Sequence, residues 1–87
     1  MGEYQVDGAT MVATSSRMDG PEFREACNRL MEADGAELYI DLMAISYMSS
    51  SDIGHLVKTY KMATGLGKVL RVRVNREIYN ILALMQI

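Results

Sequence analysis

Two stretches in which every second residue is apolar constrain this fold more than any other feature. The first runs from Glu37 to Leu42 and the second from Lys68 to Val74, and such alternation predicts β-strands with one buried face. Between them, apolar residues recur at helical spacing: Ile53, Leu56, Val57, Tyr60 and Ala63. A strand, helix and strand in succession predict parallel pairing of the two strands, because the helix carries the chain back across the sheet.

The rest of the chain extends this pattern in both directions. A further strand is expected over Thr10–Ser15, with a possible edge strand over Tyr4–Val6. A helix is expected to begin at Asp19-Gly20-Pro21 and to end at Gly35 in the left-handed conformation. The final helix has Asn75 as its cap and an apolar inner face made of Ile78, Ile81, Leu82 and Met85. The sequence therefore predicts one α/β domain over residues 1–87, in the order β(β)αβαβα, with a mostly parallel β-sheet and helices largely on one side.

Composition narrows the functional classes. The net charge is −2 and the nine basic residues are dispersed, so no nucleic-acid surface is expected. One cysteine and one histidine cannot build a zinc site, and we expect neither metal nor cofactor. No apolar stretch reaches the roughly 20 residues that span a bilayer, and the chain does not begin like a signal peptide. We therefore expect a cytoplasmic protein without membrane insertion.

The segment Tyr47–Gly54 contains the side chains most suited to a functional site. It places Ser49, Ser50 and Ser51 between a strand and a helix, where parallel α/β folds gather their sites. A serine before a helix usually caps it, and capping with loop solubility is the simpler interpretation of the cluster. One cap uses one serine, however, so at least one hydroxyl is left for another role. A phosphate there would lie near free N–H groups and the positive end of the helix dipole.

Other candidate residues have simpler explanations. Asp52 lies in the first helical turn, where a carboxylate is favourable. His55 follows Ser51 by four residues, as a base beside a nucleophile would, but no oxyanion stabiliser or orienting carboxylate accompanies it. Cys27 lies on an apolar helical stripe and is expected to be a core thiol. Gly65-Leu66-Gly67-Lys68 lacks the spacing of a phosphate loop and is interpreted as a helix stop. We therefore expect no enzyme activity.

Together, these motifs resemble the STAS domain, and within it the bacterial anti-sigma factor antagonists. Leu38–Leu42 is similar to the central strand of that family, and Tyr47–Gly54 is similar to its aromatic-Met-Asp-Ser-Ser-Gly-hydrophobic-Gly signature. Arg17-Met18-Asp19 resembles the Arg-Leu-Asp that opens the first helix of the family. The chain differs at Ser49, where the family usually has Asp, and at Asp52, where it usually has Gly.

The resemblance implies a binding domain that is switched by serine phosphorylation. Its partners would be an anti-sigma factor that is also an ATPase-type serine kinase, and a phosphatase. By position the phosphate acceptor is Ser50, with Ser49 and Ser51 as alternatives. The residues expected to contact a partner are Asp19, Met48, Ser49, Ser51, Asp52, His55 and Lys58.

The same resemblance allows a second function without phosphorylation. The domain would then be a STAS scaffold or accessory subunit, for example in a stress-sensing assembly or a lipid-transport complex. In both cases we expect a monomer or a weak dimer.

Overall fold

The structure is a computed structural model that describes residues 4–14 and 20–84 of the 87-residue chain. These residues form a four-stranded sheet in the order β1-β2-β3-β4, together with helices α1, α2 and α3. The strands are β1 (Tyr4–Asp7), β2 (Thr10–Ala13), β3 (Glu37–Leu42) and β4 (Val69–Val74). The helices are α1 (Gly20–Met31), α2 (Ser50–Gly65) and α3 (Arg76–Leu84).

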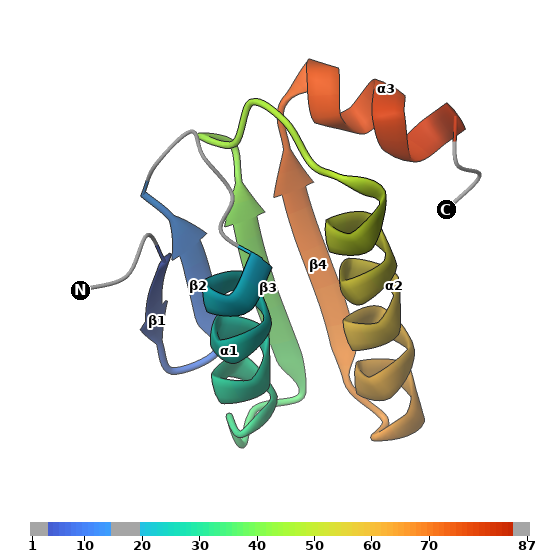
Figure 1. The fold of residues 1–87 in the computed structure, drawn as a ribbon. Coiled ribbons are helices and arrows are strands. Elements are labelled where there is room, and N and C mark those ends of the chain that lie inside the picture. Colours follow the sequence, from blue (N-terminus) through green and yellow to red (C-terminus); the bar gives the residue numbers. More distant parts are fainter. Residues whose placement is uncertain (1–3, 15–19, 85–87) are drawn as a thin grey trace.

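The sheet is parallel except at its first strand. β1 is antiparallel to β2, whereas β2 pairs with β3 and β3 with β4 in parallel. Figure 1 shows α1 and α2 on one face of this sheet, with α3 beyond the end of β4. The predicted order, the mostly parallel sheet and the one-sided helices are therefore confirmed.

The core lies between the sheet and the two helices that cover it. Leu38, Ile40 and Leu42 of β3 face this core, with exposed fractions of 1% or less. The helices contribute the apolar stripes that the sequence indicates: Phe23, Ala26, Cys27 and Leu30 from α1, and Ile53, Leu56 and Ala63 from α2. In α3 only Ile78 is buried, while Ile81 and Leu82 are half-buried.

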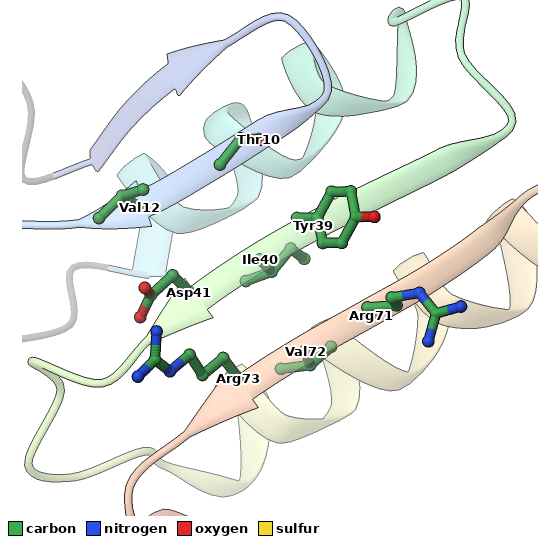
Figure 2. A pocket seen from close by; sticks show the side chains of 8 residues that line it. All are labelled: Thr10, Val12, Tyr39, Ile40, Asp41, Arg71, Val72 and Arg73. Atoms are coloured by element: carbon green, nitrogen blue, oxygen red, sulfur yellow. The ribbon is translucent and has the colours of Figure 1, made fainter.

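The other face of the sheet is largely open. Tyr39, Arg71 and Arg73 are exposed on it, as the alternation in β3 and β4 predicts. Figure 2 shows these side chains with Asp41 over a shallow depression. Tyr39 Oη donates a hydrogen bond of 2.6 Å to Glu37 Oε1, and Arg71 Nη2 lies 3.9 Å from Glu37 Oε2.

Several local expectations need correction. β2 ends at Ala13, β4 begins at Val69 and α2 begins at Ser50, a turn earlier than its apolar pattern. Gly35 does not have the positive φ predicted for it; Gly67, which follows α2, has a φ of 76°. The first helix instead ends through short turns, in which Glu32 and Ala33 donate backbone bonds to Arg29 and Leu30, so no left-handed residue is needed there.

Candidate functional site

The serine cluster lies at the edge of the sheet where its parallel strands end. Figure 1 shows α1 and α2 both beginning at this edge. Their first turns are close neighbours, since a Cβ atom placed on Gly20 would lie 3.6 Å from Asp52 Oδ1. Two helix N-termini, each with a positive dipole end and free N–H groups, therefore meet beside the cluster.

Buried side chains of the loop itself and one side chain from the start of α3 hold the loop that contains the serine cluster. Ile45 and Met48 are buried in the core, with exposed fractions of 0% and 2%. The side-chain amide of Asn75 donates to Met43 O at 3.1 Å and to Ile45 O at 2.6 Å. Asn75 Oδ1 also accepts from Ile78 N at 2.9 Å, which confirms its predicted capping of α3. One side chain thus ties the serine loop to the start of the last helix.

Ser49 is the residue that caps α2. Its hydroxyl accepts a bond from Asp52 N at 3.2 Å and donates to Asp52 Oδ2 at 2.8 Å. Asp52 Oδ2 also accepts from Ser49 N at 3.1 Å, which completes a reciprocal capping box. Asp52 therefore has a specific structural role that the helix-dipole argument missed, although the Ser-x-x-Asp spacing in the sequence could have revealed it.

Ser50 and Ser51 occupy the first two positions of α2, and both are exposed. Neither hydroxyl takes part in the capping box, and the box leaves the backbone N–H groups of these two residues unused. An oxyanion attached here would therefore lie beside unused donors and the positive end of the helix. The carboxylate of Asp52, in the same first turn, has a negative charge like that of the oxyanion.

His55 and Lys58 continue the surface along α2. His55 is half-buried and packs edge-on against Phe23 of α1, with ring centroids 5.9 Å apart. Burial lowers the pKa of His55, and the positive charges of Lys58 and Arg24 lower it further, while Asp52 opposes them. His55 Nε2 is buried without a hydrogen-bond partner. Burial and the neighbouring positive charges therefore favour the neutral imidazole, which lies where the two helices meet.

Arg24 belongs to this surface and was missed from the sequence. It is exposed on α1, yet it is close enough to His55 to affect its pKa. No local pattern indicates this proximity, because it depends on how α1 packs against α2.

The structure places Ser51, Asp52, His55 and Lys58 in the first three turns of α2, with Ser49 as the cap just before them. The other two residues predicted to contact a partner are Asp19 and Met48. Asp19 lies outside the described residues. Met48 packs in the core with 2% of its surface exposed, so its side chain supports the loop, and a contact of Met48 with a partner stays a prediction.

The remaining candidates have structural explanations. Cys27 is buried, and burial raises the pKa of its thiol to about 11, against a smaller lowering by a hydrogen bond with Thr59. This confirms the prediction of a core thiol. Within residues 4–14 and 20–84, no three His, Cys, Asp or Glu side chains are grouped so that they could hold a metal ion. No helix in the same residues is long and apolar enough to span a membrane.

In comparisons with known proteins, no protein-family model matches this chain, and no curated protein is significantly similar to it. The motif resemblance and the geometry of the α2 N-terminus are therefore the indications of function.

Proposed function

We propose that this chain is a cytoplasmic regulatory domain of the anti-sigma factor antagonist type, switched by phosphorylation of Ser50. The observation that supports the proposal is that Ser49 and Ser50, although adjacent, have different roles in the structure. Ser49 is held in the capping box with Asp52, whereas Ser50 presents an exposed hydroxyl at the start of α2. The acceptor can therefore be modified without loss of the helix cap.

The chain is the substrate in this reaction, and the chemistry belongs to an ATPase-type serine kinase. The Ser50 oxygen attacks the γ-phosphorus of ATP, the bond to the β-phosphate oxygen breaks, and ADP leaves. The hydroxyl proton passes to a base of the kinase, which also supplies magnesium and the stabilisation of the transferred group. A phosphatase restores the hydroxyl by hydrolysis.

The switch acts through charge at a docking surface. A phosphoserine adds about −1.5 to −2 charges, next to the carboxylate of Asp52. The helix N-terminus tolerates this charge, so the domain stays folded. A partner that packs against Ser51, His55 and Lys58 must then desolvate the phosphate or face its repulsion. We infer that the unmodified form binds the anti-sigma kinase and that the phosphorylated form releases it.

The test is phosphorylation by the ATPase-type serine kinases of the same organism. Wild type, Ser50→Ala and the matched control Ser51→Ala are incubated with kinase and Mg-ATP, and intact mass is measured. We expect one phosphoryl group on wild type and Ser51→Ala and none on Ser50→Ala. Phosphate retained by Ser50→Ala but lost in Ser51→Ala would contradict the assignment of the acceptor.

Binding measurements separate the switch from a scaffold. Ser50→Asp is expected to keep the fold but to weaken kinase binding by about tenfold or more, since like charges at an interface cost several kcal/mol. Tight binding that is unaffected by ATP and by Ser50→Asp would instead support a STAS scaffold or accessory subunit without a phosphate cycle.

A further inference from the structure

The outer side of β4 is an open edge of the sheet. β4 is the last strand in the order β1-β2-β3-β4, and its partner within the described residues is β3 alone. It spans six residues, compared with four for β1 at the opposite edge. An edge strand of this length offers a row of unpaired backbone groups to another strand.

The direction of these backbone groups follows from one hydrogen bond. Val69 N donates to Ala36 O at 2.9 Å, so the backbone groups of Val69 point toward β3. Because these directions alternate along a strand, Arg71 and Arg73 also bond toward β3. The N–H and C=O groups of Leu70, Val72 and Val74 therefore point outward from the sheet.

An apolar groove runs beside this edge on the helix side. It has a volume of about 380 Å³, and its lining comes from α2, β4 and α3: Leu56, Val57, Tyr60, Leu70, Val72 and Leu82. Tyr60 is 52% exposed, so the groove reaches solvent. A strand added to β4 would place every second side chain over this groove.

The opposite face of β4 is basic. Arg71 and Arg73 are exposed there, and Figure 2 shows both on the same face as Tyr39 and Asp41 of β3. β3, the strand that pairs with β4 inside the sheet, has side chains complementary to both faces of β4. β3 has Glu37 and Asp41 on the arginine face and apolar residues on the helix face, with Asp41 opposite Arg73. The molecule itself therefore shows which kind of strand fits against β4.

A second copy of β4 fits this edge poorly. Two copies related by a two-fold axis would pair antiparallel, with outward-bonding residues opposite each other. The two registers that overlap over most of the strand are centred on Val72 or on Arg71. The first places Arg71 opposite Arg73 of the copy, and the second places Arg71 opposite itself. Like charges directly opposite each other destabilise a strand pair.

We propose that the β4 edge binds an extended strand of a separate polypeptide in which acidic and apolar residues alternate. Backbone groups of Leu70, Val72 and Val74 bond to the added strand. Its apolar side chains fill the groove beside Tyr60, and its carboxylates lie beside Arg71 and Arg73. This is strand addition to a sheet edge, in which backbone bonds give affinity and alternate side chains give specificity.

The test uses two synthetic peptides of the length of β4, one alternating glutamate with valine and leucine and one with lysine in place of glutamate. Fluorescence anisotropy should show the glutamate peptide binding about tenfold more tightly, from two favourable cross-strand charge pairs. The double variant Arg71→Glu with Arg73→Glu should reverse this preference. Both side chains are exposed, but charge reversal places like charges beside Asp41 and Glu37 of β3, so the fold of this variant is checked by circular dichroism. The milder double variant Arg71→Gln with Arg73→Gln should fold normally and should abolish the preference between the two peptides.

Backbone pairing is tested separately with Val72→Pro. This change removes an outward N–H and leaves the bonds to β3 in place, and proline is tolerated at such edge positions. Binding of the glutamate peptide should be lost, with the fold checked by circular dichroism. Ser50→Asp is the matched control and should leave peptide binding unchanged, which separates this proposal from the phosphorylation switch.

Amide hydrogen exchange measured by NMR gives a readout at single residues. The peptide should slow exchange at Leu70, Val72 and Val74, whereas Val69, Arg71 and Arg73 should be protected with or without it. Equal affinity for both peptides, no binding, or binding that survives Val72→Pro would overturn the proposal. So would a dimer in analytical ultracentrifugation that Val72→Pro abolishes.

Discussion

Replacing Ser49 by alanine should destabilise the protein much more than replacing Ser50 by alanine. The two serines are adjacent and chemically identical, so the difference depends only on the capping box. Ser49→Ala removes the acceptor for Asp52 N and the donor to Asp52 Oδ2, at 3.2 and 2.8 Å. Ser50→Ala removes an exposed hydroxyl that contributes nothing to the box.

The magnitude follows from these contacts. Loss of an N-cap side chain costs about 1 kcal/mol and up to about 2 kcal/mol. The second bond adds little beyond this range because the pair is only partly buried, and water replaces it in part. We expect a loss of about 1–2 kcal/mol in the free energy of unfolding for Ser49→Ala, equivalent to about 4–16 °C in Tm for a domain of this size. Ser50→Ala should stay within about 0.5 kcal/mol of wild type.

Urea denaturation followed by circular dichroism measures both variants. Asp52→Ala and the double variant with Ser49→Ala complete a double-mutant cycle, in which the coupling energy should exceed about 0.5 kcal/mol. The reasoning is refuted if Ser49→Ala is neutral or if Ser50→Ala is equally destabilising. The first result would mean that Ser49 does not cap α2, and the second that the Ser50 side chain also stabilises the fold. In either case Ser50 would not be free of a structural role.

Three further predictions concern stability and reactivity. Burial lowers the pKa of His55, so below about pH 6.5 the unfolded state takes up a proton before the folded state does, and the free energy of unfolding should fall. Urea denaturation at pH 7.5 and at pH 5.5 should show this loss of stability, and His55→Gln should reduce it. An equal loss in His55→Gln would contradict the prediction. The Cys27 thiol, with a pKa of about 11, should resist Ellman's reagent at pH 8 in the native protein and react quickly in urea, so rapid native labelling would show that it is not buried. Gly54→Ala should stabilise the protein by about 0.5–1 kcal/mol, because Gly54 lies within α2 with no atom near its Cβ position. Gly67→Ala should destabilise it by about 1 kcal/mol, because Gly67 has a φ of 76°; thermal melts that show the same sign for both glycine variants would refute this pair.

The order of elements and their buried faces could be predicted from the sequence. The alternation in β3 and β4 and the helical spacing in α1 and α2 are local properties, and each hydrophobic face has one way to reach a core. The parallel pairing of β3 and β4 followed from the helix between them. The cap at Asn75 could also be predicted, because a capping bond joins residues three apart.

The cap of α2 at Ser49 is a local contact with Asp52, whereas the position of the loop that contains it depends on contacts distant in sequence. Any of three adjacent serines can cap a helix, but only Ser49 is followed three residues later by an acidic residue, Asp52, as a capping box requires. Burial of Ile45 and Met48 fixes where the loop ends, and Asn75 holds the loop from 30 residues or more away. With the loop fixed in this way, Ser49 falls at the cap and Ser50 is exposed.

The surroundings of the site also required the tertiary structure. Only the packing of α1 against α2 places Gly20 beside Asp52 and Arg24 near His55. The open edge of β4 likewise depends on strand order, because an edge strand and a central strand can share the same alternating pattern. The sequence by itself determined which residues form each element and which face of it is apolar. The tertiary structure decided which polar groups meet and which stay exposed, because those contacts join residues that no local pattern relates.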